Sequence, residues 1–198
     1  MFSSLATQLL RLRFSAIFSA MLTSCTGEET PAWEVVEWRF GIHETSTWRP
    51  LNDGVMGGMS SGRIAWEEES LVWNGTTSLA NNGGFASIRS PWGETNLSGM
   101  GQAVVVCRGS GGPFKLVLET SERWWMPYAY ASFHPSSDWQ EVVIPLREFR
   151  WNMARMGDLK AVSASELGSV LRVGLMKYDG TAQPFELEVR SISFQGAD

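Results

Sequence analysis

The sequence predicts an all-β protein that folds as an antiparallel β-sandwich or jelly roll. Three observations lead to this prediction. Short runs rich in Val, Ile, Phe, Tyr and Trp recur along the chain, and clusters of Gly, Pro, Asn, Asp and Ser separate them. Long segments with the helical period do not alternate with these runs. Tryptophan and glycine are abundant, with 10 and 20 residues among 198, and this composition favours strands joined by tight turns.

About ten strands are expected, at a spacing typical of a sandwich that resembles a galactose-binding domain. The clearest runs are residues 63–67, 71–75, 85–89, 102–108, 114–120, 128–133, 139–146, 171–178 and 185–194. The turn at residues 68–70 makes the first two runs a predicted hairpin. Residues 151–168 lack a strand pattern and predict a long connection with a short helix near Ala164–Leu167. Residues 31–198 are therefore expected to form a single β-sandwich domain.

The last run carries a change in its alternation. Its apolar residues have odd numbers up to Val189 and even numbers from Ile192 onward. Successive side chains of a strand point to opposite faces, so this change of parity requires one extra residue in the strand. We therefore expect a β-bulge near Arg190 and Ser191.

The charge of the chain excludes one class of partner. The formal net charge is −5, with a sequence pI near 5.1, so no broad basic field attracts nucleic acid. Signatures of RNA- and DNA-binding motifs are also missing from the sequence. Nucleic acid is therefore not an expected partner.

The sequence offers no recognisable catalytic set. His43 and His134 are isolated, and no nucleophile elbow, phosphate-binding loop or metal-ligand spacing is present. Cys107 ends the apolar run at residues 103–107, where a thiol packs as a small hydrophobic group. We expect a protein that is not an enzyme, with no cofactor and no metal.

Residues 1–30 are predicted to be a targeting leader with a linker. Arginines precede a short apolar stretch, and no acidic residue occurs before Glu28. The residues Leu22-Thr23-Ser24-Cys25 resemble the lipobox of bacterial lipoproteins, in which the cysteine is lipidated after cleavage. Cys25 is the candidate lipidation site, and the expected location is the bacterial cell envelope. Two alternatives stay open: an organelle transit peptide, and translation from Met21 that gives a cytoplasmic protein.

Residues 52–62 form the most glycine-rich stretch, with the sequence NDGVMGGMSSG. Asn, Asp and Gly tolerate positive φ, so successive tight turns are expected here. Backbone N–H groups of such turns can form a concavity that accepts an anion. The alternative interpretation is a purely structural connection into the first strand of the sandwich. The candidate binding residues of this stretch are Asn52, Asp53, Met56, Gly57, Gly58 and Ser60.

A second group of candidate residues is predicted to share one face of a sheet. In the run at residues 85–89, Ala86 and Ile88 point inward, so the other residues point outward. An arginine beside an aromatic ring suits a carboxylate, a sugar or a peptide carbonyl. Tyrosine and tryptophan in the segment ERWWMPYAY are typical of binding hot spots, although core packing is the alternative. The candidates are Phe85, Ser87, Arg89, Lys115, Trp124, Tyr128 and Tyr130.

Four segments together resemble the complex I intermediate-associated protein 30 family. They are NDGVMGGMSSG, NNGGFASIRS, WQEVVIPLREF and FELEVRSISF, and the resemblance extends over about residues 38–194. It implies a galactose-binding-domain-like jelly roll. It also implies an assembly-factor or chaperone role in which the domain binds protein and catalyses no reaction. The motif residues that correspond are Asn52, Asp53, Val55, Met56, Gly57, Gly58 and Ser60, with Gly83, Gly84, Phe85, Ser87 and Arg89.

Two functions from different classes follow. The first is a protein-binding module in the assembly or scaffolding of a membrane or respiratory complex. The second is a carbohydrate-binding envelope lipoprotein, favoured by the fold and the tryptophans. We also expect the two glycine-rich segments to be neighbours in the fold, with Asp53 near the guanidinium of Arg89.

Overall fold

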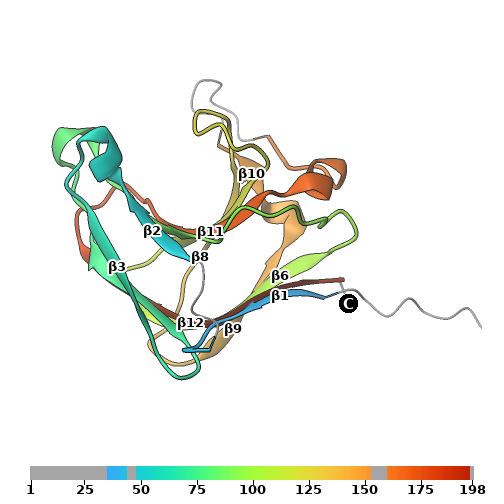
Figure 1. Cartoon of the computed structure of the whole chain (residues 1–198), viewed down its shortest axis with the longest axis horizontal. Helices are drawn as coiled ribbons and strands as arrows, with labels where there is room; N and C mark the ends of the chain where they lie inside the picture. The colour runs from blue at the N-terminus through green and yellow to red at the C-terminus, as the bar shows by residue number, and fades with distance from the viewer. Residues whose placement is uncertain (1–34, 44–47, 153–159, 197–198) are drawn as a thin grey trace, which may run out of the picture. The chain divides into compact units, whose positions relative to one another are not determined.

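Two antiparallel sheets of six strands each face one another in the computed structural model (Figure 1). The structure describes residues 35–43, 48–152 and 160–196. Within these residues the only helical segments are short 3-10 turns. The prediction of an all-β sandwich is therefore confirmed.

The first sheet, sheet A, has the strand order β3-β4-β12-β6-β9, and β1 also pairs with β12. The long strand β12 lies between β4 and β6 and holds the sheet together over twelve residues. The strands of sheet A are β1 (Val36–Arg39), β3 (Ser61–Trp66), β4 (Leu71–Thr76), β6 (Gln102–Ser110), β9 (Gln140–Pro145) and β12 (Pro184–Gln195).

The second sheet, sheet B, has the strand order β10-β8-β7-β11-β5-β2. Its strands are β2 (Arg49–Asn52), β5 (Ala86–Arg89), β7 (Phe114–Glu119), β8 (Ala129–Phe133), β10 (Arg150–Trp151) and β11 (Arg172–Lys177). The 3-10 turns are η1 (Asp53–Met56), η2 (Ala80–Asn82), η3 (Leu146–Glu148) and η4 (Ser165–Ser169).

The core lies between the inner faces of the two sheets. Aromatic side chains dominate its centre, where Trp73 of sheet A packs against Phe114 of sheet B and against Phe185. Cys107 is buried in this core, and burial raises the pKa of its thiol to about 12. It therefore packs as a hydrophobic group, as its apolar run predicts.

The register of β12 confirms the predicted β-bulge. Val189 pairs with Cys107 and Ser191 pairs with Val106, so Arg190 is the extra residue. The carbonyl of Arg190 accepts a hydrogen bond of 2.8 Å from the N–H of Phe40. The bulge thus changes the parity of the strand and also fixes the segment that follows β1.

Three strands of the described structure were not expected from the sequence: β1, β2 and β10. Strand β2 contains Pro50, which cannot donate a ladder hydrogen bond, and it is tolerated because β2 is the edge strand of sheet B. Strand β10 includes Trp151, the first residue of the segment that was expected to lack strands. The short helix expected near Ala164–Leu167 is the 3-10 turn η4.

None of the helical segments in residues 35–43, 48–152 and 160–196 is long and apolar enough to cross a membrane. The predicted leader, including Cys25, lies outside these residues.

Candidate functional site

The glycine-rich stretch connects the edge of sheet B to the edge of sheet A. Strand β2 runs into η1, and the chain then turns into β3. Gly57 ends η1 with φ of 87°, a left-handed conformation that favours glycine. Asn52 pairs with Ala86 across β2 and β5, so the two glycine-rich segments are neighbours, as expected.

The carboxylate of Asp53 is buried at the centre of this connection, where the side chain is 1% exposed. Its Oδ1 accepts the N–H of Ser60 at 2.8 Å. Its Oδ2 accepts the hydroxyl of Ser60 at 2.5 Å and the backbone N–H groups of Gly84 and Phe85 at 2.6 and 3.2 Å. One carboxylate therefore ties three segments of the chain together.

The hydrogen bonds determine the ionisation of this carboxyl group. Burial acts to raise the pKa of Asp53, but the hydrogen bonds from Ser60, Gly84 and Phe85 outweigh it and hold the pKa below its ordinary value. Gly83 packs so closely that a Cβ atom there would lie 2.5 Å from Oδ2 of Asp53. Backbone N–H groups from both glycine-rich segments, those of Ser60, Gly84 and Phe85, thus surround the carboxylate of Asp53.

The predicted pairing of Asp53 with Arg89 is wrong. The guanidinium of Arg89 lies instead 2.9 Å from Oε1 of Glu119, on the neighbouring part of sheet B. Arg172 binds the other carboxylate oxygen of Glu119 at 2.6 Å. The prediction failed because the sequence does not show that β11 lies between β5 and β7 and brings these three residues together.

The ion cluster of Arg89, Glu119 and Arg172 is mostly buried on the outer face of sheet B. The side chains of Arg89 and Arg172 are each 17% exposed, and Glu119 is 12% exposed. Burial lowers the pKa of Arg89, Glu119 raises it, and the net shift is downward. The indole of Trp92 covers the guanidinium of Arg172, whose carbon lies 3.7 Å from the ring centroid. Strands β5, β7 and β11 together position the cluster.

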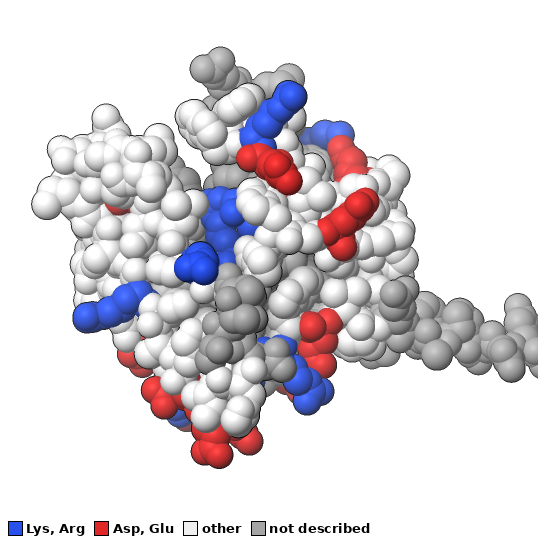
Figure 2. All heavy atoms as spheres, viewed as in Figure 1, with Lys and Arg blue, Asp and Glu red and all other residues white. Residues whose placement is uncertain are grey.

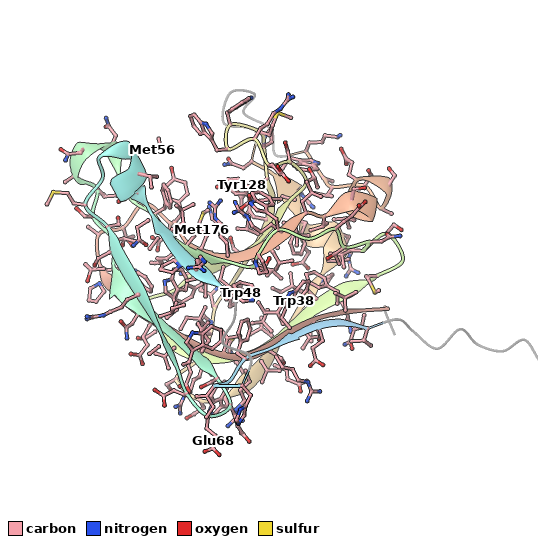
Figure 3. All side chains as sticks on the ribbon, in the orientation of Figure 1. Trp38, Trp48, Met56, Glu68, Tyr128 and Met176 are labelled. Atoms are coloured by element: carbon pink, nitrogen blue, oxygen red, sulfur yellow. The ribbon has the colours of Figure 1, made fainter. Side chains whose placement is uncertain are left out.

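Aromatic rings and a lysine continue this face toward β8. The ammonium of Lys115 lies 4.4 Å from the ring centroid of Tyr130 and 4.9 Å from that of Tyr178. Burial lowers the pKa of Lys115, and Asp179 acts in the opposite direction. The hydroxyl of Tyr128 lies 3.7 Å from the sulfur of Met176. Figure 3 shows Tyr128 and Met176 on the side of sheet B that faces away from sheet A.

Burial raises the pKa of Tyr128 to about 12, so its hydroxyl stays protonated at neutral pH and serves as a hydrogen-bond donor. The rings of Tyr178 and Tyr130 add to this upward shift, whereas Arg89 opposes it. The face therefore offers donors and cations, while the carboxylate of Glu119 is engaged by two arginines.

The face is positively charged although the protein is acidic. Strands β2, β5, β11, β7 and β8 present four cations outward and one carboxylate. Arg49 pairs directly with Arg89 across β2 and β5, so both side chains lie on the same face. Figure 2 shows Lys and Arg side chains in a hollow of the surface, beside a lobe that is almost free of charge. The cations are Arg49, Arg89, Arg172 and Lys115, and the carboxylate is Glu119.

The predicted site residues fall into two groups. Those of the first group serve the glycine-rich connection: the side chains of Asp53 and Ser60 bond each other, and Asn52 donates to the carbonyl of Gly62 at 3.1 Å. Gly57 and Gly58 form the turn, and Met56 is exposed at its tip. The second group lies on or beside the outer face of sheet B: Phe85, Ser87, Arg89, Lys115, Tyr128 and Tyr130. Trp124 is exposed on the loop between β7 and β8.

The residues of the face that the sequence reasoning missed include Glu119, Arg172, Trp92 and Tyr178. The alternation of β7 places Glu119 on the same side as Lys115, and this signal was available in the sequence. The other three residues come from β11 and from segments that follow strands, so only the strand order reveals their position.

Residues 35–43, 48–152 and 160–196 contain no group of three or more His, Cys, Asp or Glu that could hold a metal ion. Cys107 is buried in the core, away from solvent. The described residues of the face supply cations, hydroxyl donors and aromatic rings.

The fold and this face define the chain as a β-sandwich module. Its structure is similar to the family 11 carbohydrate-binding module of a cellulosomal cellulase from Clostridium thermocellum, with a TM-score of 0.60 and 14% identity. That match covers 83% of this chain and 96% of the module. The same module in complex with a β-1,3-1,4-mixed-linked tetrasaccharide gives a TM-score of 0.51 at 14% identity, over 86% of this chain and 92% of the module.

At the level of sequence, the profile of the complex I intermediate-associated protein 30 family matches residues 38–189, and the chain belongs to this family. The resemblance drawn from the four sequence segments is thereby confirmed. Comparison with curated proteins yields no significant match.

Proposed function

We propose that this protein is a noncatalytic binding module, and that the outer face of sheet B binds an acidic segment of a protein partner. The observation that carries the proposal is the excess of cations on this face. Strands β2, β5, β7 and β11 present four cations and one carboxylate outward, in a chain of net charge −5. A surface of this kind favours segments rich in carboxylates over neutral or basic segments. Membership of the family supports a role in assembling or scaffolding a membrane or respiratory complex.

The aromatic side chains of the face strengthen the proposal. Tyr130, Tyr178 and Trp92 each have a cation over the ring. Such pairs hold the ammonium and guanidinium groups in place, so a bound carboxylate meets groups that are already positioned. Tyrosine, tryptophan and arginine are also the residues most enriched among hot spots of protein interfaces.

Carbohydrate binding is the second candidate function. It is supported by the structural similarity to a module solved with a bound tetrasaccharide. However, a sugar binds an aromatic platform by stacking on an open ring face. Lys115 covers one face of Tyr130 and of Tyr178, and Arg172 covers one face of Trp92. This arrangement favours the acidic protein ligand.

One pair of experiments separates the two functions. The tagged chain is crosslinked in its native cells, and captured proteins are identified by mass spectrometry. The purified chain is screened in parallel on a glycan array. We expect capture of a defined protein with an acidic segment, and capture that weakens as salt is raised because exposed charges are screened. Saturable binding to one glycan class, with no specific protein captured, would overturn the proposal.

The leader bears on the cellular location of the protein. We propose that the mature protein is anchored at the bacterial envelope through a lipid on Cys25, as the residues Leu22-Thr23-Ser24-Cys25 indicate. Intact-mass analysis of the mature N-terminus tests this directly. An acylated Cys25 supports the anchor, whereas an N-terminus at Met21 or a cleaved leader without a lipid contradicts it.

A further inference from the structure

A pair of loops and one further loop extend from the sandwich on the side of sheet B that faces away from sheet A (Figure 1). The first contains η1 and η2, with the residues 54–60 and 77–84, and we call it the apolar tip. The second is the loop between β7 and β8, at residues 120–128. Apart from Tyr128 at the end of the second loop, these residues lie outside the cationic face, and the proposed function does not account for their side chains.

The apolar tip exposes large hydrophobic side chains. They range from 50% exposed for Leu79 to 70% for Val55, and they also include Met56 and Met59. Residues 54–60 and 77–84 contain no charged side chain. Figure 2 shows the corresponding lobe almost entirely white, and Figure 3 places Met56 at its end. A contiguous exposed apolar surface of this kind marks an interaction site.

The loop between β7 and β8 also exposes large hydrophobic side chains, directly after the exposed charged residues Glu122 and Arg123. Trp124 is 81% exposed, and Trp125 and Met126 are also exposed. The two indole rings contact each other edge to face, with centroids 5.9 Å apart. Tryptophan is the side chain that prefers the interface between lipid headgroups and hydrocarbon.

Several polar groups of the apolar tip are bonded within the protein. The N–H groups of Gly57 and Gly58 donate to the carbonyls of Gly54 and Asp53, at 3.1 and 3.0 Å. The side-chain amide of Asn81 donates to the carbonyl of Gly57 at 3.0 Å and joins the two loops of the tip. These groups therefore keep their hydrogen bonds when the tip leaves water, which is a condition for entering lipid.

From these observations we infer that the apolar tip and Trp124–Met126 insert into the interfacial region of a lipid bilayer. The tip protrudes from the sandwich, carries no charge and has its two loops joined by the hydrogen bond from Asn81, so it enters a fluid medium without a complementary protein groove. The cations of the face behind the loops match the phosphates of the headgroups in charge. The inference concerns the loop tips and goes beyond the proposed ligand of sheet B.

A fluorophore at the tip tests the inference. In the full chain, Cys25→Ser is combined with Met56→Cys, and the new thiol is labelled with an environment-sensitive nitrobenzoxadiazole probe. Cys107 is buried and its thiol pKa is raised to about 12, so it does not compete for the label. The control carries Val143→Cys instead. Val143 is 51% exposed on the outer face of sheet A, and lipid bound by the leader affects both proteins equally.

Vesicles of phosphatidylcholine and phosphatidylglycerol are then added. We expect the label at position 56 to shift to shorter wavelength with a severalfold rise in emission, and brominated lipids to quench it. The label at position 143 is expected to stay unchanged. An unchanged label at position 56, or equal changes at both positions, overturns the inference.

Discussion

At the scale of single residues, the carboxylate of Asp53 performs the task that the glycine-rich stretch suggested for a bound anion. Four donors converge on its two oxygens: the N–H and the hydroxyl of Ser60, and the backbone N–H groups of Gly84 and Phe85, which come from a separate segment of the chain. The cost of burying a carboxylate is offset only when its oxygens are hydrogen-bonded in this way. The family motif around Asp53 is therefore explained by the connection between the two sheets, without an external ligand.

Replacing Asp53 with asparagine tests this explanation. The amide NH2 group would face N–H or O–H donors in place of an acceptor oxygen, so at least one buried donor would lose its partner. We expect the free energy of unfolding to fall by about 2–4 kcal/mol. Urea unfolding followed by tryptophan fluorescence measures it, with the exposed Asp138→Asn as the control. A loss below about 0.5 kcal/mol, the range of ordinary surface substitutions, would contradict the explanation.

The same carboxylate predicts an acid dependence of stability. The folded pKa of Asp53 lies below its ordinary value of 3.8, so the unfolded chain takes up the proton first as the pH falls. The stabilisation is present above pH 3.8 and is lost as the pH falls through the folded pKa. We therefore expect the difference in unfolding free energy between the wild type and Asp53→Asn to narrow below that pH. A constant difference in urea titrations from pH 6 down to the acid range would show that the carboxylate is not the source.

At the scale of elements, the bulge of β12 shows how one residue sets the orientation of a whole strand. Arg190 is the unpaired residue, and the side chains on both sides of it keep facing the core. Removing Arg190 leaves a regular strand with the same inward residues. Removing Glu188 instead moves Val189 outward and places Arg190 in the core position opposite Cys107.

Two single-residue deletions in the same strand therefore have unequal outcomes. We expect the protein without Arg190 to fold with a lowered Tm, because it loses the hydrogen bond from Phe40 and the contact with Trp139. We expect the protein without Glu188 to lose cooperative folding, because burying an unpaired arginine is very costly. Thermal melting followed by circular dichroism compares them, and equal losses would refute the assignment of Arg190 as the extra residue.

The sequence was informative where a pattern is local. The alternation of apolar residues predicted most strands, the hairpin of β3 and β4, and the bulge of β12. It failed for β2, since four residues with a proline carry little strand signal. It also failed for the partner of Arg89, because Glu119 and Arg172 reach it only through the order of strands in sheet B. Long-range pairing, which no local pattern encodes, determined which candidate residues meet.

One buried ion pair was not predicted from the sequence. Lys177 is fully buried on the inward side of β11, and its ammonium bonds the carboxylate of Asp179 at 2.5 Å. Its position follows the alternation of Val173 and Leu175, which would assign it to the core. A lysine in the core is tolerated only with a partner, and Asp179 is supplied by the turn that follows the strand.

At the scale of the whole molecule, charge differs between the outer faces of the two sheets. Sheet A presents a mixture of acidic and basic side chains, such as Glu188 beside Arg108. Strands β2, β5, β7 and β11 of sheet B present Arg49, Arg89, Arg172 and Lys115 with a single carboxylate, Glu119. An acidic partner therefore approaches the protein most favourably from the outer face of sheet B.

Reversing one charge on each outer face tests this polarity with the net charge held equal. Arg49→Glu alters the exposed edge of the sheet B face, whereas Arg63→Glu alters β3 of sheet A, where Arg63 bonds only Asn74. Both side chains are exposed, so both proteins are expected to keep the stability of the wild type.

If an acidic segment docks on sheet B, the glutamate of Arg49→Glu places a like charge against it. Binding of the captured partner is then expected to weaken by about tenfold or more, whereas Arg63→Glu is expected to bind like the wild type. Titration of the purified partner against the three proteins at two salt concentrations measures this, and the defect of Arg49→Glu should shrink at high salt. Equal weakening by both substitutions would mean that only the net charge matters and that sheet B is not the docking face.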